Sequence, residues 1–151
     1  MNKKIKLLIE NLFDNLYDID QETNSEIDLA DKIYSKSKEE LRKEIEYELK
    51  KQGPSANLNK IDVSGVTDMS HLFEGLDIRT IKIDKWDVSN VKDMSYMFAG
   101  CKKFPGKGLD NWNVCNVTNM SHMFDNCQKF WHGDLRDWNV SNVIDMSHMF
   151  A

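Results

Sequence analysis

Three histidines recur at one position of a repeated motif and are the first candidates for chemistry. His71, His122 and His148 each follow a Met-Ser pair. Side chains that recur in this way line up when repeats stack, and clustered imidazoles are common zinc ligands. The remaining copy of the motif carries Tyr96 at that position, and no carboxylate or thiolate recurs beside the histidines at ligand spacing. We therefore interpret them as surface residues of a repeat and predict no metal site.

Two cysteines, Cys101 and Cys127, also occupy equivalent positions. Neighbouring repeats would bring them close enough for a disulfide, but three cysteines in all do not form the framework of a secreted domain. We favour reduced thiols that pack as small hydrophobic side chains. A thiol nucleophile would need a histidine in a cleft, and the sequence has no glycine-rich phosphate loop and no nucleophile elbow. We predict no enzymatic activity and no cofactor.

The remaining candidates are side chains that the repeat pattern leaves on the surface. Trp131 lies outside the register of the other tryptophans. An exposed tryptophan is a typical anchor of a protein interface, whereas a loop aromatic that folds back onto the core is equally common, and both alternatives stay open. The candidate partner-binding residues are Lys82, Asp84, Lys107, Asp110, Trp131, His132, Asp134 and Arg136.

The elements that position these residues follow from four copies of one motif, which we number as repeats 1 to 4: residues 63–73, 88–98, 114–124 and 140–150. Each copy ends in a phenylalanine, and these phenylalanines are 25, 26 and 26 residues apart. A unit of this size cannot bury its apolar side alone, so units must stack and like residues must form ladders. The spacing of Val, Met and Phe predicts a short strand and a short helix in each unit, with Asp or Asn as the helix N-cap.

From Trp86 onward the units follow the pattern Trp-(Asp/Asn)-Val-Ser-Asn-Val-x-(Asp/Asn)-Met-Ser-x-Met-Phe-x-x-Cys-x-x-Phe. This pattern resembles the BspA-like repeats, which are related to leucine-rich repeats and occur in mycoplasma surface lipoproteins and in many bacterial and mobile-element proteins. The resemblance covers about residues 57–151 and implies a right-handed solenoid that contacts proteins and has no catalytic centre. The first unit departs from the pattern, with Ile61 in place of the tryptophan and Leu76 near the cysteine position, and Cys115 replaces the usual serine.

The first part of the chain has the periodicity of helices. Apolar residues at i, i+3, i+4 and i+7 predict an amphipathic helix over about residues 2–18, and a second helix is predicted from Ser25. Ser37 and Glu40 form a capping box that starts a third helix, and Gly53 ends it. We expect these helices to pack onto the first repeat.

Together these patterns predict an α/β repeat solenoid of the leucine-rich-repeat-like kind, with a short strand and a short helix in each unit and an N-terminal cap of three helices. Residues 1–56 are the predicted helical cap, and residues 57–151 are the predicted solenoid of about three and a half units. The cap is expected to cover the apolar surface and unpaired edges that the end of a solenoid exposes.

The composition excludes several classes of protein. The chain has 151 residues with 20 basic and 25 acidic side chains and a net charge of -5, which excludes a strongly basic nucleic-acid binder. RNA binding through Trp131, Lys102, Lys103 and Lys107 stays as an alternative. Apolar runs do not exceed three or four residues, whereas a membrane-spanning helix needs about 20. No signal-peptide apolar core follows Met1, so we expect a cytoplasmic protein of a bacterial or host cell.

We expect a non-enzymatic module that binds an unidentified protein partner and neither nucleic acid nor a membrane directly. One predicted function is that of a phage or mobile-element inhibitor, such as an anti-CRISPR, of a nucleic-acid-handling enzyme, because acidic side chains can occupy a groove meant for phosphates. The alternative, which the resemblance suggests, is a cell-surface adhesin or a lipoprotein-type repeat fragment. The last unit closes on Phe150 and Ala151 without a polar capping element, so a homodimer through this end is a further expectation.

Overall fold

The structure is a computed structural model, and it describes residues 2–5 and 36–151. The chain divides into two compact units, Met1–Ser35 and Lys36–Ala151. In the first unit, residues 3–5 are helical, and the remainder of the first two predicted helices lies outside the described residues. The second unit contains the repeats together with one long helix, and all side chains discussed below belong to it.

Helix α3 (Lys38–Gln52) confirms the third predicted helix. Ser37 is its N-cap: the Ser37 hydroxyl accepts a hydrogen bond from the Glu40 N–H, and the Glu40 carboxylate accepts one from the Ser37 N–H. This capping box satisfies two backbone donors that no helical carbonyl reaches. The helix ends at Gly53, whose φ of 87° lies in the left-handed region and whose N–H donates to the Leu49 carbonyl.

The predicted architecture of the repeats is wrong. Residues 53–151 contain neither a β-sheet nor a further helix, so the chain is not an α/β repeat solenoid with a strand and a helix in each unit. A cap of three helices is likewise not seen among the described residues. The repeats consist of turns and share only isolated parallel bridges, which join Asn57 to Lys82, Asp68 to Asp93, Asp93 to Asn119 and Asn119 to Asp145.

A left-handed residue in each copy of the motif explains why the Met-Ser-x-Met-Phe segments are not helical. The φ angle lies between 54° and 60° at His71, Tyr96, His122 and His148. An α-helix requires negative φ at every residue and N–H groups that donate four residues back along the chain. Here the N–H groups of alternate residues donate to the next repeat instead, as the Met94 N–H does to the Asn119 carbonyl at 2.9 Å. Each segment is therefore a series of turns whose backbone N–H groups donate to the next repeat.

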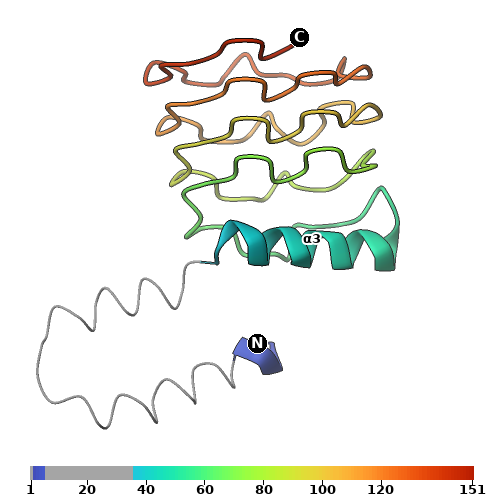
Figure 1. The fold of residues 1–151 in the computed structure, drawn as a ribbon. Helices are drawn as coiled ribbons and strands as arrows, with labels where there is room; N and C mark the ends of the chain where they lie inside the picture. Colours follow the sequence, from blue (N-terminus) through green and yellow to red (C-terminus); the bar gives the residue numbers. More distant parts are fainter. Residues whose placement is uncertain (1, 6–35) are drawn as a thin grey trace, which may run out of the picture. The chain divides into compact units, whose positions relative to one another are not determined.

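Like residues of successive repeats lie on one another, as the repeat spacing predicts. Figure 1 shows the coils of this unit following one another from α3 to the end of repeat 4. The ring centroids of Phe73 and Phe98 are 5.1 Å apart, and those of Phe98 and Phe124 are 5.6 Å apart. Trp86 and Trp112 are stacked at 6.2 Å with their planes 8° apart. These rings belong to one continuous core together with the buried valines and methionines of the motif.

Helix α3 packs onto repeat 1, as expected for a helix that covers the first repeat. Its Leu41 and Ile45 side chains are completely buried in the common core. The Arg42 guanidinium donates to the His71 carbonyl at 2.7 Å, and Lys38 Nζ lies 3.0 Å from the Asp68 carboxylate. Within the described residues, no helix combines the length and apolar character needed to cross a bilayer.

Candidate protein-binding surface

The predicted binding residues of the central repeats do not converge on a site. The Lys82, Lys107 and Asp110 side chains are exposed, and none of them forms a hydrogen bond or an ion pair within residues 36–151. Asp84 is also exposed and accepts a hydrogen bond from Asn59 Nδ2 at 2.9 Å, which holds the pKa of this carboxyl below its ordinary value. We therefore regard these four residues as solvated side chains of successive repeats.

The other four predicted residues come together at residues 130–136. Trp131 is 61% exposed and does not fold back onto the core, and Lys129 Nζ lies 4.7 Å from the centroid of its ring. The loop that carries Trp131 is fixed through its backbone, because the His132 N–H donates to the Pro105 carbonyl at 2.9 Å. This bond ties the loop to the equivalent loop of the preceding repeat.

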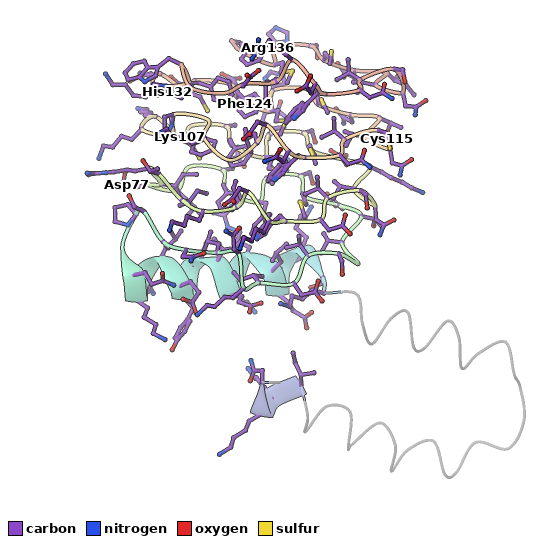
Figure 2. All side chains as sticks on the ribbon, turned by 180° about the vertical axis from the view of Figure 1, so that it is seen from behind. Asp77, Lys107, Cys115, Phe124, His132 and Arg136 are labelled. Carbon is purple, nitrogen blue, oxygen red and sulfur yellow. The ribbon has the colours of Figure 1, made fainter. Side chains whose placement is uncertain are left out.

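Close contact between these two loops requires glycine. Gly106 has a φ of 86°, and a Cβ atom built on it would lie 2.9 Å from the Gly133 backbone. A side chain at residue 106 would therefore both strain the backbone and push the loops apart. Figure 2 shows the neighbouring Lys107 and His132 on the same edge of the stack, with Cys115 on the opposite edge. The Trp131 loop is thus packed closely against the equivalent loop of the preceding repeat.

A forked ion pair stands beside the loop. Arg136 Nη2 donates to Asp134 Oδ2 at 2.6 Å, and Arg136 Nε donates to Asp134 Oδ1 at 2.9 Å. The hydrogen bonds from Arg136 lower the pKa of Asp134 to about 2. Both side chains are exposed, so water and salt screen the pair and it adds little to stability. The pair places one positive group and one negative group side by side at the surface.

A shallow groove of about 590 Å³ joins these residues, and we call it the aromatic groove; it is lined by Phe130, Trp131, His132, Gly133, Asp134, Leu135, Arg136 and Phe150. The sequence identified four of the lining residues and missed the apolar ones. Phe130 and Leu135 are half-buried, and Phe150 is 60% exposed. Phe150 occupies the motif position at which the other three phenylalanines are buried, so the motif pattern alone assigns it to the core.

The repeated histidines form a ladder of stacked rings with Tyr96. The centroid distances are 4.8 Å from His71 to Tyr96, 4.4 Å from Tyr96 to His122 and 4.7 Å from His122 to His148, and the planes are within 6° of parallel. Parallel rings present their nitrogens side by side, so they do not converge on a single ion. Among residues 2–5 and 36–151, no three His, Cys, Asp or Glu side chains are grouped closely enough to hold a metal.

The equivalent cysteines are packed as thiols. Cys101 Sγ donates to the Phe73 carbonyl and Cys127 Sγ to the Phe98 carbonyl, both at 3.0 Å. Burial raises the pKa of Cys101 to about 12 and that of Cys127 to about 11. The prediction of buried reduced thiols is confirmed for Cys101, while Cys127 is partly exposed. Thiols with such raised pKa values stay protonated at neutral pH and are poor nucleophiles.

Comparison with known proteins identifies a family. Residues 43–151, well over half of the chain, match the family model described as Mycoplasma protein of unknown function, DUF285. The matched residues begin within α3 and include all four repeats and the aromatic groove. No curated protein and no solved structure matches the chain. The chain belongs to the family of mycoplasma proteins of unknown function, DUF285.

Proposed function

We propose that the chain is a protein-binding module and that the aromatic groove is its binding surface. The observation that carries this proposal is the exposure of Trp131, which is 61% exposed and lines one groove with the half-buried side chains of Phe130 and Leu135. Apolar side chains that are exposed together, rather than singly, mark interaction surfaces. Tryptophan is also strongly enriched among the residues that dominate the binding energy of protein interfaces.

The groove is lined by both apolar and charged side chains, as protein interfaces usually are. Phe130 and Leu135 contribute half-buried apolar surface, and the Phe130 ring lies 4.2 Å from the ring of Phe124 in the core. Asp134 and Arg136 are paired beside these side chains and add one negative and one positive group to the groove. Apolar side chains with charged groups beside them support the groove as a binding surface.

The charges favour a protein partner over a nucleic acid. The only basic groups of the groove lining are Arg136 and the imidazole of His132, and Arg136 is neutralised by Asp134. The whole chain carries a net charge of -5. Binding to nucleic acid depends on unpaired Lys and Arg that displace counterions from phosphates. Binding to another protein does not require such an excess of unpaired Lys and Arg side chains.

The proposal is tested by affinity capture with the tagged full chain from the lysate of its native cell. Trp131→Ala is expected to weaken the capture of a bound protein by about 30-fold, because a dominant interface tryptophan contributes about 2 kcal/mol or more. Tyr47→Ala is the matched control, since Tyr47 is 62% exposed on α3 and lies outside the groove. Equal capture by both variants would contradict the proposed surface.

We further propose that the repeats are of the BspA-like kind and that the biological role is one of two. The first is inhibition of a nucleic-acid-handling enzyme by a phage or mobile-element protein, and the second is adhesion at a cell surface. The family match to mycoplasma proteins accords with the second role, because the BspA-like resemblance includes mycoplasma surface lipoproteins. Labelling of intact cells with a membrane-impermeant amine reagent separates the two: labelled chain supports adhesion, and chain labelled only after lysis supports an internal inhibitor.

A further inference from the structure

Basic side chains of the repeats are concentrated in three equivalent loops, residues 77–81, 102–107 and 128–133. Residues 57–151 contain 10 basic and 12 acidic side chains, and the three loops hold five of the basic ones but only one of the acidic ones. The five are Arg79, Lys102, Lys103, Lys107 and Lys129, and we call this set the basic edge. The net charge of -5 therefore does not describe this part of the surface.

Stacking of the repeats brings the three loops to one side of the molecule. Lys103 Nζ lies 3.2 Å from the Asp77 carboxylate, which joins the first loop to the second. The His132 N–H donates to the Pro105 carbonyl, which joins the second loop to the third. Figure 2 shows Asp77, Lys107 and His132 along the same side of the stack. The basic edge is therefore one surface that extends over three repeats.

Most of the cations of the basic edge have no counter-charge within residues 36–151. Lys103 is paired with Asp77, and both of these side chains are more than half exposed. The other four are exposed and lie near no carboxylate at ion-pair distance in this part of the chain: Arg79, Lys102, Lys107 and Lys129. Like charges in neighbouring loops repel each other, and an acidic partner relieves this repulsion.

Lys129 joins the basic edge to the aromatic groove. Its Nζ atom lies over the Trp131 ring, 4.7 Å from the ring centroid. Trp131 lines the groove together with the half-buried Phe130 and Leu135. A carboxylate that pairs with Lys129 is therefore placed beside an exposed aromatic ring and an apolar surface. This arrangement fits a polypeptide segment in which acidic residues flank an apolar one.

We propose that the basic edge binds an acidic segment of a partner protein, from which an apolar side chain enters the aromatic groove. Carboxylates of the segment pair with Lys102, Lys107 and Lys129, and its apolar side chain contacts Trp131. Exposed charges contribute mainly to the rate of association and to specificity, whereas the apolar contact contributes more of the affinity. The inference rests on the proposed function, because it states the chemistry of the protein that the groove binds.

The observations favour an acidic polypeptide over a nucleic acid. Lys129 Nζ lies over one face of Trp131, so a nucleobase that stacks on this face must displace it. Asp134 lines the groove and repels phosphate. Eleven of the 12 acidic residues of 57–151 lie outside the three loops, so a long phosphate backbone that leaves the basic edge meets like charge. A short acidic segment is confined to the basic edge.

A peptide of four Glu-Glu-Leu triplets is the probe, and a peptide of four Gln-Gln-Leu triplets is its uncharged control. Both carry fluorescein, and fluorescence anisotropy measures their binding to the full chain. At low salt, the acidic peptide is expected to bind about tenfold more tightly than the control, because several exposed ion pairs each add a modest attraction. Sodium chloride at about 1 M, where the Debye length is about 3 Å, is expected to remove most of this difference.

Matched charge reversals locate the binding. Lys102→Glu combined with Lys107→Glu is expected to weaken binding of the acidic peptide about tenfold. Both lysines are exposed and unpaired within residues 36–151, so an unchanged urea midpoint is expected for this double variant. Lys43→Glu combined with Lys92→Glu makes the same change in net charge at exposed residues outside the basic edge. This control is expected to weaken binding less than about twofold, because salt screens distant charges.

Two outcomes would overturn the inference about the basic edge. One is equal binding of the acidic and uncharged peptides, or an equal loss of binding in the two double variants. The other is tighter binding of a short single-stranded oligouridylate than of the acidic peptide, which would assign the basic edge to a nucleic acid.

The same experiments separate this inference from the proposed function. If the acidic peptide does not bind while Trp131-dependent capture from the lysate persists, the inference falls and the proposed function stands. If the acidic peptide binds through Lys102 and Lys107 and that capture is absent, pairing with the basic edge is supported and the aromatic groove loses its proposed role.

Discussion

Replacement of Phe98 by alanine tests whether the stacked rings hold the repeats together. The Phe98 side chain is completely buried, and its ring centroid lies 5.1 Å from that of Phe73 and 5.6 Å from that of Phe124. A third ring, Phe104, lies 4.7 Å away. The substitution removes one ring from the middle of this ladder and leaves a cavity, so we expect the free energy of unfolding to fall by about 3–5 kcal/mol.

Phe150→Ala is the matched control, because it makes the same change at the same motif position. The Phe150 ring is 60% exposed and stacks on Phe124 from one side only within the described residues. With roughly two fifths of its surface buried, the same reasoning gives a loss of about 1–2 kcal/mol. The two variants therefore differ in the neighbours of the ring and not in its chemistry.

Urea unfolding of the full chain measures the difference. Trp86, Trp112 and Trp138 are buried beside the ring ladder, so their fluorescence reports the loss of stacking. For an m-value on the order of 1.5 kcal/mol/M, the midpoint should fall by roughly 2–3 M for Phe98→Ala and by about 1 M for Phe150→Ala. Equal falls in the two variants would refute the idea that the neighbouring repeats, rather than the residue type, determine the contribution of each ring.

Three further substitutions or reactions test other contacts. Arg42→Ala should lower the free energy of unfolding by about 1–3 kcal/mol, because three carbonyls lose a charged donor. Arg42→Lys should retain only part of this stabilisation, and urea unfolding midpoints measure the stability of both variants. The hydrogen bond from Lys60 holds the pKa of buried Glu48 below 4.5, so its stabilisation is present above pH 4.5 and lost as pH falls through the lowered folded-state pKa. Glu48→Gln should therefore cost about 1–2 kcal/mol at pH 7 and progressively less below pH 4.5 in thermal unfolding. In the native chain, partly exposed Cys115 should react first with a disulfide reagent, and Cys101, with a pKa of about 12, only after unfolding.

The helix next to the repeats was predictable because its signals are local. Ser37, Glu40 and Gly53 each act on backbone groups within four residues of themselves, so their types alone locate the start and the end of α3. The stacking of like residues was predictable for a different reason. Units of 25 or 26 residues cannot bury their apolar side alone, and equal spacing brings equal side chains together.

The conformation inside each repeat was not predictable from the same pattern. Apolar residues spaced three apart suit a helix, but they also suit successive tight turns. The choice depends on where the N–H groups find acceptors, and here the acceptors are in the neighbouring repeat. Gly75, Gly100 and Asn126, which share one motif position with φ between 56° and 73°, were a local sign of left-handed backbone. Tyr96 gave no such sign, because tyrosine rarely adopts positive φ, and the histidines gave only a weak one, because histidine adopts positive φ more often than most residues but still seldom.

The candidate surface was predictable in part. Trp131 departs from the register of the repeats, and this departure was enough to mark it as a side chain outside the core. Phe150 shows the limit of the pattern: its motif position is buried in three repeats and exposed in the fourth. Burial in a stack depends on the neighbouring unit, and the residues within a unit do not encode whether that neighbour covers them.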